Sequence, residues 1–123
     1  MDNEKMEQMQ MLDYQIKQMQ KVLETIDAQV FEINKTVESL QEFSALSNKE
    51  EILFPLANGI FARGTLTDNR MLRINIGSDV VVDKTVKETT EMMQKQSLEI
   101  ENYKKEVMEQ LQKFLVKMQE LQG

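Results

Sequence analysis

Cysteine and histidine are absent from the chain, and proline and glycine are rare. Among its 123 residues there are one Pro and four Gly. Without Cys, a disulfide framework, a thiolate zinc site and a Cys nucleophile are excluded. Without His, the chain lacks the commonest general base and the commonest transition-metal ligand. Since no nucleophile–base pair can be identified either, the sequence predicts a protein that is not an enzyme and that uses no metal or cofactor.

Aromatic residues are also scarce, and long apolar runs are missing. There is no Trp, and aromatics make up 6% of the residues, a composition that suits long helices better than a β-sandwich or barrel. No apolar run approaches the roughly 18 residues of a membrane span, and the N-terminus lacks the features of a signal peptide. The net charge of -6 disfavours binding to nucleic acid or to anionic lipid. We therefore expect a cytoplasmic protein with no nucleic-acid or membrane partner.

The first part of the chain carries an unbroken heptad pattern. Apolar residues recur at alternating intervals of three and four positions, which is typical of a coiled coil. The seam consists of Met9, Leu12, Ile16, Met19, Leu23, Ile26, Val30, Ile33, Val37 and Leu40. Ser44, Ser47 and Asn48 signal a stop. The pattern predicts a coiled-coil segment over residues 1–47, with a helix that runs to about Leu46.

The middle of the chain, residues 51–84, has a different character. β-Branched residues increase here, and so do turn-forming residues, namely Pro55, Gly59, Gly64 and Gly77. β-Branched residues between these turn signals predict four short strands, at 52–56, 60–66, 71–76 and 80–84, and Leu72, Ile74 and Ile76 alternate with polar residues. Asn58-Gly59 is the strongest hairpin signal, because both residues tolerate positive φ. Two hairpins alone are marginally stable in water, so we expect this segment to need partners.

Residues 85–123 return to a helical pattern that begins at about Val86. Its seam consists of Val86, Thr90, Met93, Ser97, Ile100, Lys104, Val107, Leu111, Phe114, Met118 and Leu121. Asp83 and Thr85 are candidate N-cap residues. Two long helices joined by a short β segment fold most simply as an antiparallel hairpin. The predicted fold class is therefore α+β, a long antiparallel two-helix coiled-coil hairpin with two central β-hairpins, in one domain over residues 1–123.

The order of helix, two hairpins and helix resembles the alpha class of prefoldin subunits. Residues 51–61, EILFPLANGIF, are similar to the family's first strand and turn, and residues 73–85, RINIGSDVVVDKT, are similar to the strand pair that leads into its second helix. Beta-class subunits have one hairpin in this place, so two hairpins favour the alpha class. Asn58 and Asp79 stand where family members often have Gly, and both residue types tolerate positive φ.

This resemblance implies a particular assembly and function. The expected assembly is an alpha2-beta4 hexamer, in which the chain pairs with beta-class prefoldin subunits through its strands. The expected function is that of an ATP-independent co-chaperone. It would hold non-native client proteins at the tips of its coiled coils and pass them to a group II chaperonin.

Apolar residues at the expected tip of the helical hairpin are the candidate client-binding residues. They are Met1, Met6, Met9, Met11, Leu12, Phe114, Leu115, Met118 and Leu121. Met6, Met11 and Leu115 lie off the seam, so they are harder to explain as core. Methionine is flexible and polarizable, which allows it to pack against unrelated apolar partners. The alternative is a frayed coiled-coil end that happens to contain Met.

Apolar residues of the strands are the candidate assembly residues, because strand edges expose unpaired backbone groups. They are Ile60, Leu66, Leu72, Ile74, Ile76, Val80 and Val82. The alternative is a self-contained sheet that caps the helices. Two other functions also stay open: a coiled-coil scaffold or filament-forming prefoldin-like structural protein, and an adaptor whose helices bind one specific partner. The off-seam apolar residues at the tip favour the chaperone.

Overall fold

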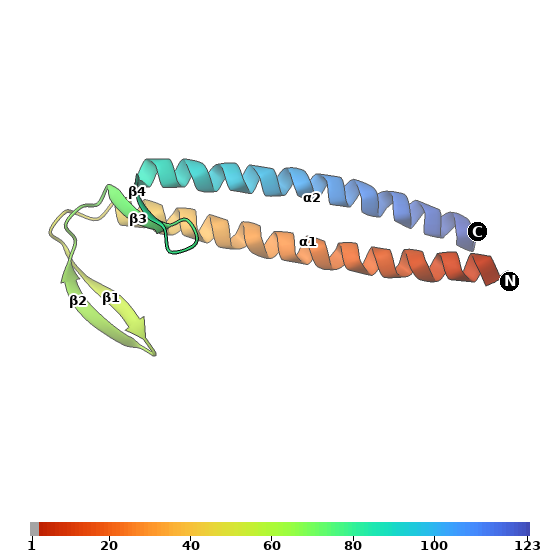
Figure 1. Cartoon of the computed structure of the whole chain (residues 1–123), viewed down its shortest axis with the longest axis horizontal. Coiled ribbons are helices and arrows are strands. Elements are labelled where there is room, and N and C mark those ends of the chain that lie inside the picture. The colour runs from red at the N-terminus through yellow and green to blue at the C-terminus, as the bar shows by residue number, and fades with distance from the viewer. Residues whose placement is uncertain (1–2) are drawn as a thin grey trace. The chain divides into compact units, whose positions relative to one another are not determined.

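The structure is a computed structural model that describes residues 3–123. Two long helices enclose four strands in the chain order (Figure 1). The elements are α1 Asn3–Ser44, β1 Glu51–Ala57, β2 Ile60–Thr65, β3 Met71–Asn75, β4 Val81–Thr85 and α2 Val86–Gln122. The predicted fold class, two long helices with two small antiparallel hairpins between them, is confirmed. The chain divides into two compact units: the helical unit, residues 3–33 with 95–123, and the strand unit, residues 34–94.

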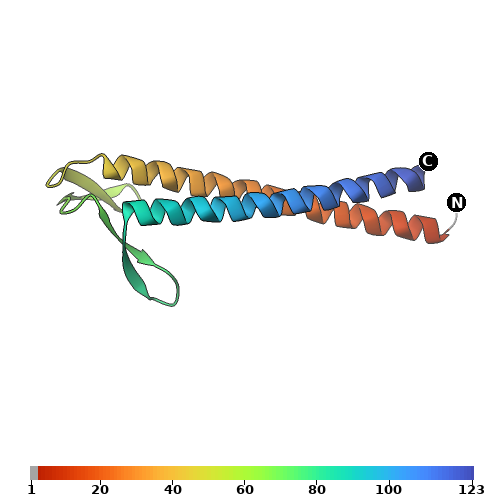
Figure 2. The same ribbon diagram turned by 90° about the horizontal axis from the view of Figure 1, so that it is seen from above.

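In the helical unit, α1 and α2 lie side by side and antiparallel, with the start of α1 and the end of α2 together (Figures 1 and 2). Every heptad position predicted for the seam in this unit is buried or half-buried. Leu12, Ile16 and Ile26 are the most enclosed, and Ile26 is only 3% exposed. Burying such a side chain contributes about 1.5–3 kcal/mol. The heptad seam is therefore the core of this unit.

One charged residue occupies the seam of α2. Lys104 is half-buried, and its Nζ donates a hydrogen bond of 2.7 Å to Oδ1 of Asp27 on α1. A lysine can bury its alkyl stem against apolar neighbours while its ammonium reaches a polar partner at the edge. Because a polar residue at a seam position favours one alignment of the helices, Lys104 and Asp27 help to define the antiparallel register.

The first hairpin, β1–β2, closes with the predicted two-residue turn. Asn58 and Gly59 both have positive φ, 50° and 77°, as a turn that matches the twist of the strands requires. The pairing register shifts between Pro55 and Ala57, a bulge at the point where proline cannot donate to the ladder. Gly64 allows the ring of Phe54 to lie over it, because a Cβ at Gly64 would collide with that ring.

The second hairpin, β3–β4, pairs Met71 with Thr85 and Asn75 with Val81 at its two ends. Its turn includes Gly77 and Asp79, both with positive φ. The Oδ1 atom of Asn75 accepts a hydrogen bond from the Gly77 N–H at 2.9 Å. Asn58 and Asp79 thus adopt the left-handed conformation expected where relatives often carry Gly.

The start of α2 agrees with the sequence prediction. Thr85 caps the helix, because its Oγ1 accepts a hydrogen bond from the Glu88 N–H at 3.0 Å. In return, Oε1 of Glu88 accepts one from the Thr85 N–H at 3.0 Å, which completes a capping box. The other candidate cap, Asp83, instead accepts a hydrogen bond from the Arg73 side chain across the hairpin at 3.1 Å.

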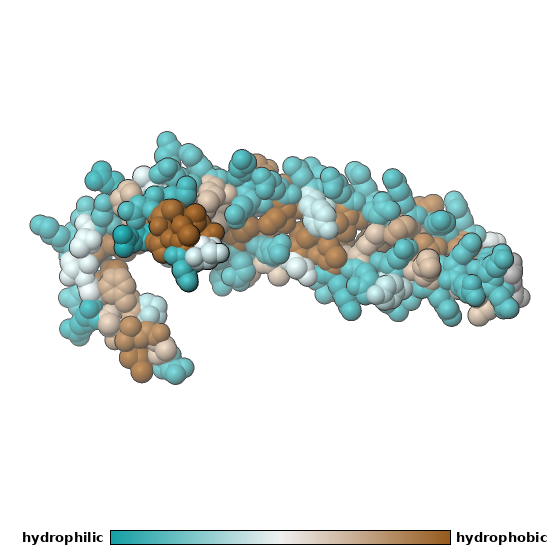
Figure 3. Space-filling view, viewed as in Figure 1, coloured by the Kyte–Doolittle hydropathy of each residue, from teal (hydrophilic) through white to brown (hydrophobic). Residues whose placement is uncertain are grey.

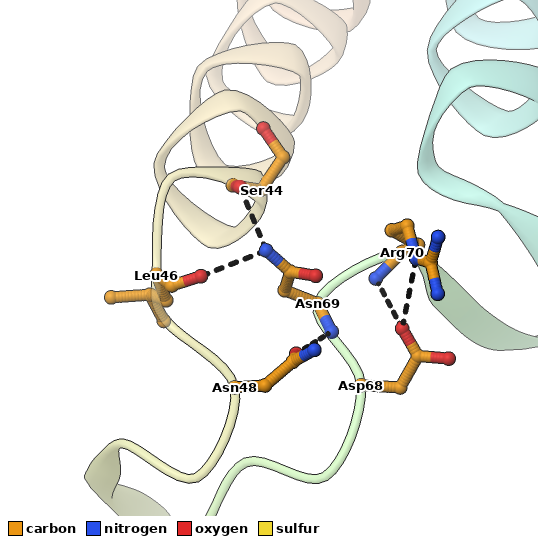
Figure 4. A network of polar contacts seen from close by, with 6 residues as sticks. All are labelled: Ser44, Leu46, Asn48, Asp68, Asn69 and Arg70. Carbon is orange, nitrogen blue, oxygen red and sulfur yellow. Dashed lines mark hydrogen bonds and ion pairs between the residues drawn. The ribbon is translucent and has the colours of Figure 1, made fainter.

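The end of α1 lies two residues before the predicted end at Leu46, and a tertiary contact explains the difference. The Asn69 side-chain amide donates hydrogen bonds to the backbone oxygens of Ser44 at 3.2 Å and Leu46 at 2.8 Å (Figure 4). The Asn69 N–H also donates to Oδ1 of Asn48 at 2.9 Å. Asn69 therefore satisfies carbonyls at the helix end and links α1 to the segment between the two hairpins.

Candidate functional site

The candidate client-binding residues lie at the end of the helical unit where the two chain ends meet. The described ones are Met6, Met9, Met11, Leu12, Phe114, Leu115, Met118 and Leu121, which we call the helical tip. Met1 lies outside the described residues. Five members of the tip belong to the heptad seams, and Leu12 is buried among them. The surface view shows apolar side chains along the line between the two helices and hydrophilic ones on either side (Figure 3).

Three members of the helical tip are exposed to solvent. Met11 is 65% exposed, and Met6 and Leu115 are 45% and 42% exposed. None of them belongs to a heptad seam, so packing between the two helices does not account for them. The tip thus combines a packed seam with apolar side chains available to a partner.

The structure brings residues of both helices together in one groove at the tip. Met11 and Leu12 of α1 and Phe114 of α2 line it, with polar side chains along its edges. Exposed Met11 therefore lies next to buried Leu12 and half-buried Phe114, so an apolar partner that binds Met11 also reaches the edge of the core. Leu115 is not among the lining residues of this groove.

Sequence reasoning missed several exposed apolar residues of the helical unit. Val116 and Met108 are exposed on α2, and Tyr14 is exposed on α1. Val116 lies beside Lys113 and Lys117 in a shallow hollow of its own. The rule that selected Leu115, an apolar residue off the seam, also selects all three. They extend the exposed apolar surface beyond the predicted set.

The candidate assembly residues of the strand unit differ widely in burial. Leu66 is buried, and its backbone N–H and C=O pair with Glu50 and Lys49 just beyond the β1–β2 ladder. Three residues are half-buried, namely Leu72, Ile74 and Val82. Three are exposed, namely Ile60, Ile76 and Val80. In the described chain these three side chains are 60%, 58% and 50% exposed.

The two hairpins expose more apolar residues than the sequence analysis selected. The missed residues of the two hairpins are Leu53, Phe54, Leu56, Phe61, Met71 and Val81. The signal was present in β1, whose residues are apolar at consecutive positions, a pattern typical of a strand buried on both faces. Each hairpin is a separate two-stranded sheet, so the outer edges of all four strands lack a partner in the sheets of residues 3–123.

Glu88, at the start of α2, is a titratable residue whose surroundings shift its pKa. Within residues 3–123, no cluster of three or more acidic side chains is placed to hold a metal ion. Hydrogen bonds from the Thr85 backbone and hydroxyl, together with nearby Lys84, hold the pKa of Glu88 below its ordinary value. This is the effect of a helix cap. Among residues 3–123, no helix qualifies as a membrane span.

Comparisons with known proteins identify the family. A family model described as "Prefoldin subunit" matches residues 12–123. The chain belongs to the prefoldin family. It is 29% identical to the prefoldin subunit alpha of Archaeoglobus fulgidus, over 97% of this chain and 87% of the relative. It is 32% identical to that of Methanococcus maripaludis strain C5, over 80% of this chain and 67% of the relative. The predicted resemblance to the alpha class of prefoldin is confirmed.

A solved prefoldin structure has the same fold. The cryo-EM structure of filamentous PFD from Methanocaldococcus jannaschii superposes with a TM-score of 0.83, over 94% of this chain and 95% of that one. The two sequences are 11% identical, so this likeness concerns the fold alone. Prefoldin subunits are chaperone subunits that assemble with one another, and membership of the family therefore assigns this chain a general role as a chaperone-type subunit.

Proposed function

We propose that this prefoldin subunit holds unfolded proteins at its helical tip without using ATP. The observation that carries the proposal is the exposure of Met6, Met11 and Leu115 beside the packed end of the seam. Unbranched Met side chains adapt their shape to different apolar partners. A surface of this kind suits clients that share apolar character and no common sequence.

We further propose that the strand unit is the assembly surface of a single-domain subunit. Its hairpins expose apolar residues and unpaired strand edges, which a neighbouring subunit would cover by extending the sheets. Beta-class prefoldin subunits in an alpha2-beta4 hexamer are the proposed neighbours. The proposed destination of the held client is a group II chaperonin in the cytoplasm.

A filament or scaffold is the second candidate function. The same exposed hairpins support it, because identical chains could also cover the strand edges of one another. The two candidates differ in what they require of the helical tip. A scaffold has no use for exposed Met6, Met11 and Leu115, whereas a holding chaperone depends on them.

The experiment compares two variants of the full chain. In the first, Met6→Gln, Met11→Gln and Leu115→Gln are combined, which removes the exposed apolar groups and leaves the seam intact. In the control, Leu98→Gln makes the same kind of change at an α2 residue that is 61% exposed and lies outside the tip. Glutamine and methionine have similar helix propensities, so both variants should remain helical.

Aggregation of a chemically unfolded client, followed by light scattering, is the readout. We expect the triple variant to lose most of its holding activity and the Leu98→Gln control to keep it. The mass of each variant, alone and mixed with a beta-class subunit, should match that of the unmodified chain. A triple variant that still prevents aggregation at the original stoichiometry would rule out the tip as the client site. A homo-filament that forms without holding activity would favour the scaffold.

A further inference from the structure

The methionines of the helical tip fall into two groups that differ in exposure. Met11 and Met6 are 65% and 45% exposed. Met9 and Met118 are half-buried and occupy positions of the heptad seams. The tip therefore presents two methionine side chains to solvent and keeps two in the packing between the helices.

The composition of the chain makes methionine its main target for mild oxidants. The sequence contains ten Met and no Cys, so no thiol competes for a peroxide. Peroxides convert methionine to methionine sulfoxide, a reaction that requires the oxidant to reach the sulfur atom. The exposed side chains of Met11 and Met6 should therefore react before those of Met9 and Met118.

We propose that Met11 and Met6 are oxidation sites through which a peroxide switches off client binding at the helical tip. The thioether sulfur attacks one oxygen of the peroxide, so that an S–O bond forms and the O–O bond breaks. The other oxygen leaves as hydroxide and takes up the proton of the first, which gives methionine sulfoxide and water. Sulfur is oxidised and the peroxide is reduced. This inference rests on the proposed holding function and adds a means of regulating it.

The position of Met11 explains why its oxidation weakens binding. Met11 lines the tip groove together with Leu12 and Phe114. Sulfoxide formation turns a flexible apolar side chain into a polar one. An apolar client segment in the groove would then cover the sulfoxide oxygen without offering it a hydrogen-bond donor. One polar group buried in this way weakens binding roughly tenfold.

The same positions allow the modification to occur without unfolding. Neither Met6 nor Met11 belongs to a heptad seam, so their sulfoxides stay in water in the free protein. Leu12 and Ile16 remain packed in the seam. A sulfoxide at Met9 or Met118 would instead place a polar group at the interface of the two helices. Oxidation limited to Met6 and Met11 should therefore change binding and leave the fold intact.

The modification is chemically reversible by a thiol-dependent reductase. Two thiols reduce the sulfoxide to methionine and become a disulfide, and the oxygen leaves as water. Because this chain contains no Cys, another protein must supply the thiols. The proposed switch is thus set by a peroxide and reset by a separate reductase.

Limited treatment of the full chain with hydrogen peroxide tests the order of reaction and its effect. Peptide mass mapping should find the added oxygen on Met11 and Met6 before Met9 and Met118. Circular dichroism should show the original helix content. The affinity for reduced and carboxymethylated lactalbumin, which stays unfolded, should fall at least tenfold and recover after methionine sulfoxide reductase and a thiol are added. A loss of helix content that accompanies the loss of binding would overturn the proposal, since unfolding would explain it.

Two variants assign the effect to the tip. Met6→Leu with Met11→Leu removes both thioethers and keeps apolar groups of similar volume and helix propensity. The control, Met108→Leu, removes a thioether that is 51% exposed on α2 outside the tip. Each variant is compared with its own untreated sample, so that an effect of the substitution itself cancels. Peroxide should weaken lactalbumin binding by the control as much as by the unmodified chain, and leave the affinity of the tip variant unchanged.

The outcomes separate this switch from the holding function on which it rests. An equal loss of affinity in the tip variant and the control would overturn the oxidation sites and leave tip binding intact. So would oxidation of Met6 and Met11 in the unmodified chain without any loss of affinity. The holding function itself fails on a different result, namely undiminished holding by the triple glutamine variant before any peroxide is added.

Discussion

Replacing Asn69 by Asp should break the hydrogen bonds that link the end of α1 to the segment between the hairpins. The two side chains have nearly the same shape, so the substitution leaves packing unchanged. It replaces an amide that donates to the carbonyl oxygens of Ser44 and Leu46 by a carboxylate that cannot donate. Two hydrogen bonds are lost at about 1 kcal/mol each. Repulsion between the carboxylate and the two carbonyls adds to this, and we expect the free energy of unfolding to fall by roughly 2–4 kcal/mol.

Asn75→Asp is the matched control for this substitution. Asn75 uses its Oδ1 atom as an acceptor for the Gly77 N–H, and a carboxylate retains that acceptor. The two variants therefore introduce the same charge in the same unit, but only one of them removes a donor. The control should change the free energy of unfolding by less than about 0.5 kcal/mol, as is usual for surface substitutions.

Urea unfolding followed by circular dichroism gives the free energies, and hydrogen exchange locates the effect. The amides of Ala45 and Leu46, which bond to carbonyls of the last turn of α1, should exchange faster in Asn69→Asp than in Asn75→Asp. At acidic pH the introduced carboxyl becomes protonated and regains one donor, so part of the stability should return. Equal free energies of unfolding for the two variants would show that the Asn69 amide does not stabilise the end of α1.

Three further substitutions test other parts of the chain. The pKa of Glu88 is lowered in the folded protein. Its stabilising effect on α2 is therefore present above the ordinary pKa of 4.5 and is lost as the pH falls through the folded pKa. Glu88→Gln should remove this pH dependence of helix content, measured by circular dichroism. Lys104→Leu makes this seam position apolar and should raise the melting temperature of the helices. Crosslinks between introduced cysteines should then reveal additional registers of α1 against α2. Phe61→Glu should prevent assembly with beta-class subunits, measured by light scattering, without a loss of helix content.

The helices could be predicted because their signals are local. Spacings of three and four residues locate the seam, and burial of Ile16 and Ile26 follows from that periodicity alone. The start of α2 near Val86 is predicted by the helical pattern and by Thr85 as a candidate cap, and the structure adds Glu88 as the second half of a capping box. Likewise, Asn58-Gly59 specifies its turn through backbone preferences that need no other part of the chain.

The features that escaped prediction depend on residues far apart in the sequence. The end of α1 accepts hydrogen bonds from Asn69, which lies 25 residues after Ser44. The tip groove requires the alignment of α1 with α2, which no periodicity within one helix supplies. The exposed residues of β1 were missed for another reason. Leu53 and Leu56 are exposed in the described chain, and they lie in a run of consecutive apolar residues that a search for alternation does not select.

The exposed methionines of the helical tip differ in stiffness from the exposed aromatic and β-branched residues of the hairpins, and the difference bears on the partners that each surface would suit. At the helical tip, Met6 and Met11 are unbranched and flexible, so they fit partners of many shapes. In the strand unit, Phe54, Ile60 and Phe61 are stiff, because aromatic rings and β-branched carbons have few rotamers. Stiff side chains lose little entropy on binding a surface of one fixed shape. The tip thus suits varied clients, and the strands suit one constant subunit interface.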